Sequence, residues 1–220
     1  MKLTFENYLK LSAYSNVVIV YPGRFQPAHK NHAKVYSVLA EKFETATVYV
    51  ATTNKVSPPN TPFSFIERKK MLEAAGVPGD KIVQTANPYV AQEIKSLYDP
   101  AVTKIIFAVG AKDMSSDKPR FNFLPTQKGD AYFKPLGDIL KITPKNVEEM
   151  FTLDKHGYVA IAPTYSFSIN ITGKPLSIKG ATEIRELYRT ASEAGKQEII
   201  TQLYGSFNED IYELFNNKLL

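Results

Sequence analysis

Nearly continuous runs of apolar, mostly β-branched residues alternate along the chain with longer segments whose apolar residues recur every three or four positions. Such runs are typical of strands buried on both faces of a parallel sheet, and the longer segments are typical of helices that cover a sheet. A strand, a helix and a second strand in that order form a parallel crossover unit. The pattern therefore predicts an α/β protein with an open parallel sheet and helices on both faces.

The predicted elements follow one another over most of the chain. Strands are expected at residues 17–20, 47–52, 81–84, 104–109 and 158–162. Helices are expected at residues 30–43, 65–75, 90–98, 147–153 and from 181 onward, and Ser64 and Glu67 have capping-box spacing before the second of them. Residues 114–137 are expected to form an irregular insertion, while residues 164–171 either reach the ligand edge of the sheet or form an extra strand.

The 220 residues suit one domain with small additions at its ends. Residues 1–16 are expected to form an N-terminal helical cap, residues 17–190 the main domain, and residues 191–220 a C-terminal helical extension of that domain. The apolar residues of this extension either cover the sheet or meet another subunit of a homo-oligomer.

Composition excludes several classes of protein. The chain has no cysteine, which excludes disulfides and thiolate metal sites. It has neither a visible secretory signal nor an apolar run of about 18 residues, so we expect a cytoplasmic protein without membrane contact. The net charge of +5 favours anionic ligands, but the sequence has no basic stripe of the kind that would favour nucleic acid.

The strongest chemical signal lies directly after the first predicted strand. Gly23 and two prolines force a tight turn there, and His29 and His32 follow where a helix begins. Residues three positions apart share a helix face, so both imidazoles can point at one spot beyond the carboxyl end of the strand. A helix N-terminus attracts anions, and imidazoles donate hydrogen bonds and carry charge near neutral pH. These residues predict a polyphosphate site; the alternative is a surface helix whose histidines have no function.

The segment Gly23-Arg24-Phe25-Gln26-Pro27, followed by His29 and His32, resembles the first signature of the nucleotidyltransferase superfamily of cytidylyltransferases and adenylyltransferases. That signature contains a His-x-Gly-His motif, and the lead-in looks most like the branch of nicotinamide mononucleotide adenylyltransferases. The resemblance implies a Rossmann-like fold in which the backbone at Gly23, Arg24 and Phe25 lines the nucleotide pocket. Asn31 stands where the family has glycine, and asparagine is the other residue that best tolerates unusual backbone angles.

Gly110 and Asp113 follow the strand predicted at residues 104–109. They resemble the second signature, a glycine with a nearby aspartate that contacts the nucleotide. Asp113 can accept hydrogen bonds from ribose hydroxyls or hold a metal-bound water. The alternative is that this aspartate only caps the N-terminus of a helix.

Residues 182–185, with Thr182 and Arg185, resemble the end of the third signature, Ile-Ser-Ser-Thr-x-Ile-Arg, which opens a helix against the triphosphate. Residues 179–181 replace its first part, so two hydroxyls are lost while Lys179 can add a cation. The helix start supplies N–H groups, Thr182 a hydroxyl and Arg185 a forked cation. The alternative is an ordinary helix with an exposed arginine.

Three further residues are candidates for substrate binding. The resemblance favours Arg68 within a cluster of cations, Asn87 follows the strand at residues 81–84 to the ligand edge, and Arg120 lies in the insertion. The insertion mixes cations with aromatic rings that can clamp a base and its phosphates, or form a mobile flap or a platform for single-stranded nucleic acid. Its candidate residues are Lys118, Arg120, Phe121, Phe123, Tyr132 and Phe133.

The resemblance implies that a substrate phosphate attacks the α-phosphorus of a nucleoside triphosphate and releases pyrophosphate, with His29, His32 and Arg185 as the catalytic residues. A phosphate monoester is already an anion, so this chemistry needs positioning and positive charge rather than a dedicated base. ATP and nicotinamide mononucleotide are the expected substrates, NAD is the expected product, and Mg²⁺ is expected to arrive with the triphosphate. The alternatives are a cytidylyltransferase acting on a phosphorylated alcohol and a nucleotide-binding protein that has lost turnover.

Overall fold

The structure is a computed structural model that describes residues 14–115, 120–125, 127, 129–171, 173–178 and 180–220. The described chain forms two compact units, each assembled from three stretches of sequence. The first unit contains residues 14–22, 35–51 and 85–164, and the second contains residues 23–34, 52–84 and 165–220. Apart from its last three positions, the helical cap expected at residues 1–16 lies outside the described residues.

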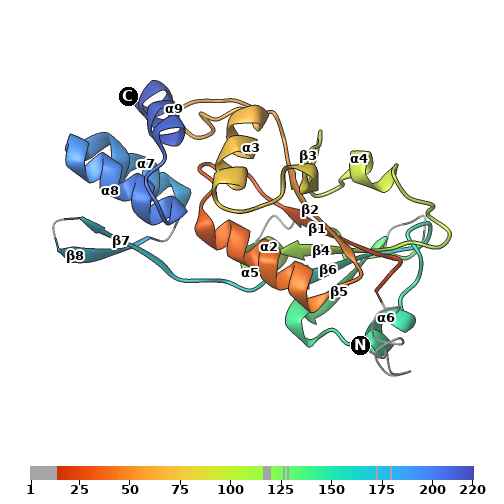
Figure 1. Ribbon diagram of the computed structural model, residues 1–220. Helices are drawn as coiled ribbons and strands as arrows, with labels where there is room; N and C mark the ends of the chain where they lie inside the picture. The colour runs from red at the N-terminus through yellow and green to blue at the C-terminus, as the bar shows by residue number, and fades with distance from the viewer. Residues whose placement is uncertain (1–13, 116–119, 126, 128, 172, 179) are drawn as a thin grey trace. The chain divides into compact units, whose positions relative to one another are not determined.

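The first unit is built around a parallel sheet (Figure 1). Five of its strands lie in the order β2-β1-β4-β6-β5, and all neighbours run parallel. Their bounds are Val17–Pro22 (β1), Thr47–Thr52 (β2), Lys104–Val109 (β4), Phe133–Asp138 (β5) and Gly157–Ile161 (β6). The strand order reverses between β1 and β4, which creates the switch point at which open α/β sheets bind ligands. The predicted α/β, Rossmann-like class is confirmed.

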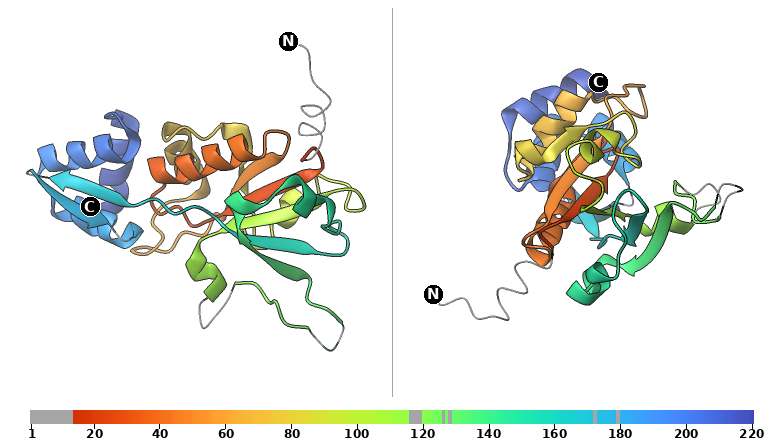
Figure 2. Two further views of the ribbon diagram at one scale, coloured as in Figure 1. Left: turned by 90° about the horizontal axis from the view of Figure 1, so that it is seen from below. Right: turned by 90° about the vertical axis from the view of Figure 1, so that its right-hand side faces the viewer.

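Short helices connect the strands of this unit. Their bounds are Gln92–Lys95 (α4), Ala111–Ser115 (α5), Ile139–Lys141 (η2, a 3-10 helix) and Pro144–Glu148 (α6). The later part of α2 (Lys30–Lys42) also belongs here, and the views of Figures 1 and 2 show it along one face of the sheet. Val35, Leu39 and Phe43 are buried, as the helical spacing of these apolar residues predicts.

Three expectations for the first unit are wrong. The helix expected at residues 90–98 covers only α4, because Ala91 has a left-handed backbone (φ 49°) that a helix cannot include. The helix expected at residues 147–153 begins earlier, because Thr143 and Asn146 form a capping box. The stretch expected to be irregular ends in β5, where the pairing with β6 shifts between Pro135 and Asp138.

The second unit combines a hairpin with helices. Its elements are Phe65–Ala74 (α3), Gly79–Lys81 (η1), Ile82–Gln84 (β3), Phe167–Ile171 (β7), Lys174–Ile178 (β8), Ala181–Thr190 (α7), Glu193–Tyr204 (α8) and Glu209–Leu219 (α9). β7 and β8 pair antiparallel, so residues 167–171 form the extra strand, whereas β8 was not expected. Gln202 on α8 exchanges two hydrogen bonds with the backbone of Asn170 on β7.

A buried aromatic cluster holds the helices of the second unit together. The Phe215 ring of α9 lies 5.3 Å from the ring of Phe63 and 5.1 Å from that of Tyr188 on α7. All three side chains are fully buried. Among the described residues, no helix has the length and apolar character needed to cross a bilayer.

Candidate functional site

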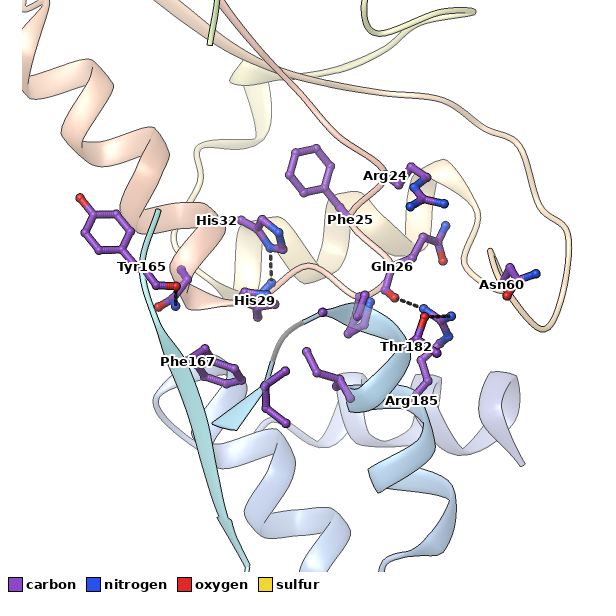
Figure 3. A pocket seen from close by; sticks show the side chains of 16 residues that line it. Arg24, Phe25, Gln26, His29, His32, Asn60, Tyr165, Phe167, Thr182 and Arg185 are labelled. Carbon is purple, nitrogen blue, oxygen red and sulfur yellow. Dashed lines mark hydrogen bonds between the residues drawn. The ribbon is translucent and has the colours of Figure 1, made fainter. Parts of the chain in front are cut away.

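The second unit contains a cavity of about 520 Å³, a volume in the range of small-molecule sites (Figure 3). Its wall comes from the turn between β1 and α2, the loop before α3, the start of β7, the end of β8 and the start of α7. These segments are far apart in sequence but belong to one compact unit. The cavity brings together six of the expected site residues: Arg24, Phe25, His29, His32, Thr182 and Arg185.

The two histidines lie against each other at the start of α2. Their ring centres are 3.9 Å apart, and the backbone N–H of His29 donates to Nδ1 of His32 over 3.2 Å. An accepting Nδ1 carries no proton, so neutral His32 carries its proton on Nε2 and can donate from there. His29 Nδ1 is buried and has no hydrogen-bond partner within the described chain. One imidazole is therefore fixed in its tautomer, and the other has an unused polar atom.

The expectation that both histidines carry charge near neutral pH is wrong. Burial, with the nearby charge of Lys30, lowers the pKa of His29 to about 4. Burial and the proximity of His29 lower the pKa of His32 well below its ordinary value. Both rings are thus neutral N–H donors at pH 7. A bound anion would raise both pKa values because it favours the imidazolium form.

The turn before the histidines is shaped by Phe25. This residue has a left-handed backbone (φ 47°), and its buried ring meets the His32 ring edge-on at 5.0 Å. A Cβ atom on Gly23 would lie 2.5 Å from the Phe25 ring, a distance that real Cβ contacts do not reach. Gly23 does not line the cavity. The glycine expected to admit a ligand close to the backbone instead admits the ring of Phe25.

Arg185 reaches the cavity from the first turns of α7. Its Nη1 donates to the carbonyl oxygen of Gln26 (2.6 Å) and its Nη2 to Thr182 Oγ1 (3.2 Å), whereas its buried Nε has no partner within the described chain. Burial lowers the pKa of Arg185, and the positive charges of Arg189 and Arg24 lower it further. A guanidinium remains charged at neutral pH, so these crowded cations make the site electropositive. The expected convergence of Arg185 with both histidines is present in the cavity wall.

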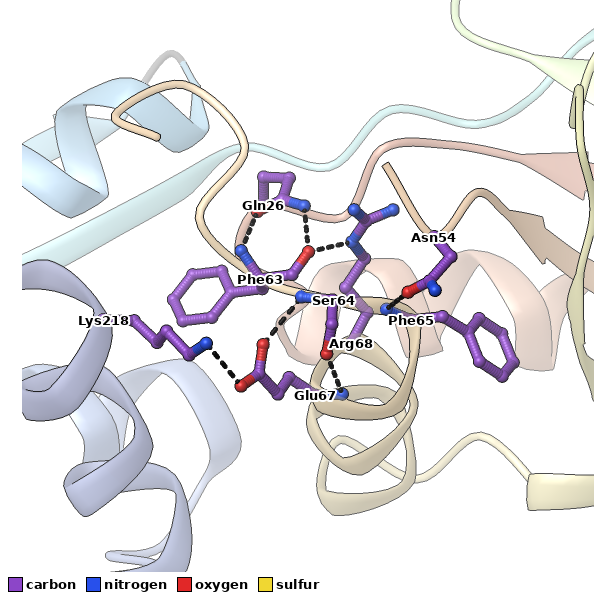
Figure 4. Close-up of polar contacts among 8 residues, drawn as sticks. All are labelled: Gln26, Asn54, Phe63, Ser64, Phe65, Glu67, Arg68 and Lys218. Atoms are coloured by element: carbon purple, nitrogen blue, oxygen red, sulfur yellow. Dashed lines mark hydrogen bonds and ion pairs between the residues drawn. The ribbon is translucent and has the colours of Figure 1, made fainter. Parts of the chain in front are cut away.

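Gln26 connects three segments of the second unit, and sequence reasoning assigned it no role (Figure 4). Its side-chain amide donates to the Phe63 carbonyl (2.8 Å) and accepts from the Phe63 N–H (3.0 Å). Its own carbonyl accepts from Arg185. The sequence held one signal for this role. Gln26 stands between Phe25 and Pro27, and a turn there does not require an amide side chain, so the amide indicates a hydrogen-bonding role.

Arg68 lies outside the cavity wall, although the resemblance favoured it for substrate binding. Its guanidinium donates to the carbonyl oxygens of Phe63 (2.8 Å), Thr53 (2.5 Å) and Lys55 (2.5 Å), and to Thr52 Oγ1 (3.0 Å). Burial lowers its pKa to about 10, so the cation persists at pH 7. Arg68 therefore stabilises the loop before α3 through these hydrogen bonds, and it does not line the cavity.

Asn31, Tyr165 and Phe167 also line the cavity, and sequence reasoning did not propose them as site residues. Asn31 was expected to use its tolerance of unusual backbone angles. It has an ordinary helical backbone in α2, and its side chain is hydrogen-bonded to residues 165 and 166. The sequence carried no signal for this pairing, because the partners are backbone carbonyls more than 130 positions away.

Four expected site residues belong to the first unit. Arg120 Nε lies 2.6 Å from Asp113 Oδ1, and the Arg120 guanidinium lies 4.4 Å from the centre of the Tyr89 ring. Asn87 caps a turn by accepting from the Tyr89 N–H over 3.0 Å. Asp113 is the third residue of α5, so the alternative that it caps that helix is wrong. Ligand contacts of Asn87, Gly110, Asp113 and Arg120 remain predictions.

Of the aromatic residues expected to clamp a base, Phe121 is buried, and Phe123, Tyr132 and Phe133 are partly buried. Phe121 is almost fully buried and packs on the rings of Phe107 and Phe133 at 5.6 and 4.9 Å, so it belongs to the core of the first unit. Lys118 and Lys179 lie outside the described residues.

Comparison with solved structures finds two crystal structures of a bifunctional NMN adenylyltransferase/ADP ribose pyrophosphatase from Francisella tularensis, one of them complexed with AMP and a Mn ion. Each is 19% identical to this chain and matches 92% of it, with TM-scores of 0.47 and 0.45. The chain spans about half the length of these proteins, 49% and 48%. Comparison with curated protein sequences gives no match.

A model of the cytidylyltransferase-like family matches residues 20–153, more than half of the chain. The matched region contains the histidine pair, and α7 with Arg185 follows it. The chain belongs to the cytidylyltransferase-like family.

Proposed function

We propose that the protein is a nucleotidyltransferase that transfers a nucleoside monophosphate from a nucleoside triphosphate to a phosphate-bearing acceptor. One observation carries the proposal. Two buried polar atoms, His29 Nδ1 and Arg185 Nε, have no partner within the described chain, and both side chains line the same cavity. An unsatisfied buried polar group costs about 1–3 kcal/mol, which a bound anion would recover. Membership of the cytidylyltransferase-like family indicates the class of reaction.

The chemistry suits these side chains. An oxygen of the acceptor phosphate forms a bond to the α-phosphorus, the bond from that phosphorus to the bridging oxygen breaks, and pyrophosphate leaves with the electron pair. His29 and His32 donate to the oxygens of the α- and β-phosphates, where negative charge accumulates. Arg185, with Thr182 beside it, holds the leaving pyrophosphate. No residue needs to abstract a proton from an acceptor that is already an anion.

We propose that Mg²⁺ is brought by the triphosphate. Among the described residues, no group of three or more His, Cys, Asp or Glu side chains could hold a metal ion. Magnesium is commonly bound through substrate phosphates with few protein ligands, and it neutralises phosphate charge when bound. The cavity residues contribute cations and N–H donors, so they complement the phosphates of such a complex.

ATP and nicotinamide mononucleotide are the proposed substrates, and NAD is the proposed product, because the lead-in Gly23 to Pro27 resembles that branch of the superfamily. The test is a panel of four nucleoside triphosphates against nicotinamide mononucleotide and phosphorylated alcohols, with Mg²⁺. Release of pyrophosphate is measured and the products are identified. ATP with nicotinamide mononucleotide is expected to react; CTP with a phosphorylated alcohol would indicate the cytidylyltransferase instead.

The matched variants are His32→Ala and His156→Ala. His156 is the third histidine of the chain and lies directly before β6 in the first unit. His32→Ala is expected to lose at least about tenfold in rate, whereas His156→Ala keeps the rate of the parent protein. Full activity of His32→Ala would refute the mechanism. Nucleotide binding without pyrophosphate release over the whole panel would identify a binding protein that has lost turnover.

A further inference from the structure

The first turn of α2 binds the segment that leads into β7. Asn31 Nδ2 donates to the carbonyl oxygen of Tyr165 over 3.3 Å and to that of Ser166 over 3.2 Å. Both contacts lie within the second unit. Figure 3 shows Tyr165 beside α2, at one end of the cavity wall. A single amide group thus fixes two consecutive peptide units next to the site.

Two lysines on the same side of α2 support this contact. Lys34 Nζ lies 4.1 Å from the centre of the Tyr165 ring, and Lys30 Nζ lies 5.7 Å from the centre of the Phe167 ring. Cation–π contacts at partly exposed sites are worth about 0.5–1 kcal/mol each. Asn31 adds two directional hydrogen bonds from α2 to residues 165 and 166.

The segment held by Asn31 continues directly into Phe167, whose ring covers His29. The two rings are nearly parallel, with an angle of 7° and centres 5.1 Å apart. Phe167 thereby shields one face of the imidazole from water. The unpartnered Nδ1 of His29 belongs to the same imidazole ring.

We propose that Asn31 is a positioning residue for His29: by fixing the backbone at residues 165 and 166, its carboxamide keeps Phe167 stacked on the His29 imidazole. The catalytic consequence rests on the proposed function. The stacking itself does not, since it concerns contacts within the protein. Without Asn31, the segment before β7 moves away, water reaches His29, and the imidazole loses its fixed orientation.

The titration of His29 distinguishes positioning from general structural support. If Asn31 only stabilised the fold, its replacement would leave the pKa of His29 unchanged. Its pKa is lowered by burial and by the charge of Lys30, and the His32 ring on α2 lies against it. Phe167 brings no charge. Loss of the stacked ring is therefore expected to raise the pKa of His29 toward its ordinary value by increasing hydration.

The experiment is an NMR titration of the imidazole resonances in the full chain, which has only three histidines to assign. Asn31→Ala and Phe167→Leu are each expected to raise the His29 midpoint by at least about one pH unit. The double variant is expected to show no further increase, because both changes remove the same contact. Asn217→Ala, an exposed asparagine on α9, is the matched control and is expected to leave the midpoint unchanged.

Two outcomes separate this inference from the proposed function. If the parent protein transfers nucleotides, Asn31→Ala is expected to lower kcat about tenfold while KM for the triphosphate changes less than about threefold. An unchanged His29 midpoint in Asn31→Ala overturns the positioning role, even if the protein is an active transferase. A raised midpoint in a protein without transferase activity supports the positioning role and counts against the proposed function alone.

Discussion

Two buried arginines in the second unit occupy very different surroundings. Arg68 is drawn in Figure 4 with one of its acceptors, the Phe63 carbonyl; in all, three carbonyl oxygens and two threonine hydroxyls accept from its guanidinium. Arg185 lies in the cavity wall drawn in Figure 3, where two acceptors are present and its Nε has none. Both side chains are at most 4% exposed, so burial alone does not distinguish them.

The difference lies in how many donors the protein itself satisfies. A guanidinium that donates hydrogen bonds to several loop carbonyls stabilises the local fold, because its removal leaves these buried acceptors without partners. A cation in a cavity wall that the protein leaves with an unused donor has capacity left to bind an anion. The same contrast separates His32, whose Nδ1 accepts from a backbone N–H, from His29, whose Nδ1 is unpaired.

The largest expected effect is a loss of activity on replacing Arg185, and it tests whether this arginine binds an anion. Arg185→Lys keeps a positive charge but loses the fork, so pyrophosphate release is expected to fall about 100-fold in kcat/KM. The melting temperature is expected to change by only a few degrees. The measurement is steady-state pyrophosphate release beside a thermal unfolding curve. Activity within about twofold of the parent protein would exclude Arg185 from the site.

Arg68 is expected to show the opposite pattern. Arg68→Met leaves at least three carbonyl oxygens in the loop before α3 without this donor, so the free energy of unfolding is expected to fall by about 3 kcal/mol. Activity per folded molecule is expected to stay within about threefold of the parent protein. Urea unfolding and active-site titration measure the two quantities. A large loss of activity at unchanged stability would place Arg68 with Arg185.

Two glycines next to the cavity can be compared in a similar way, by the space available for a side chain. A Cβ atom on Gly23 would lie 2.5 Å from the Phe25 ring, whereas one on Gly180 would have no neighbour within 4 Å. Gly23→Ala is expected to destabilise the protein by about 1–3 kcal/mol, and Gly180→Ala by less than about 0.5 kcal/mol. Chemical unfolding of both variants is the test, and equal effects would contradict the packing of Phe25 over Gly23.

The smallest expected effect concerns pH. The pKa of His29 is lowered to about 4, so on acidification the unfolded chain binds a proton before the folded chain does. The contribution of neutral His29 is therefore fully present above about pH 6.5 and is lost as the pH falls toward 4. Because the ring is partly exposed, the loss is on the order of 1 kcal/mol. Thermal unfolding between pH 7 and pH 4.5 should show a weaker pH dependence in His29→Gln than in His156→Gln.

Much of the fold follows from local patterns. The apolar runs predicted β1, β2, β4 and β6, because strands buried on both faces need little but apolar side chains. Ser64 and Glu67 form the predicted capping box at the start of α3, with the Ser64 N–H donating to Glu67 over 2.7 Å. β5 was missed because an edge strand tolerates proline and glycine, which otherwise indicate a turn.

The candidate site was predicted in outline. Residue types and helical spacing indicated His29, His32 and Arg185, and all three line one cavity. The same reasoning did not separate Arg68 from Arg185, since the sequence does not state which carbonyls surround a guanidinium. It also could not predict Asn31, Gln26 or Phe167, whose partners are backbone groups or rings distant in the chain.

The sequence by itself determined the parallel sheet and indicated the family, and it predicted an anion site, because these depend on apolar periodicity and on residue types at fixed local spacing. Only the tertiary structure decided that the histidines are neutral, that Arg68 holds a loop and that Asn31 holds the segment before β7. The physical reason is that pKa values and hydrogen-bond partners depend on burial and on neighbours that the fold brings together from distant parts of the chain.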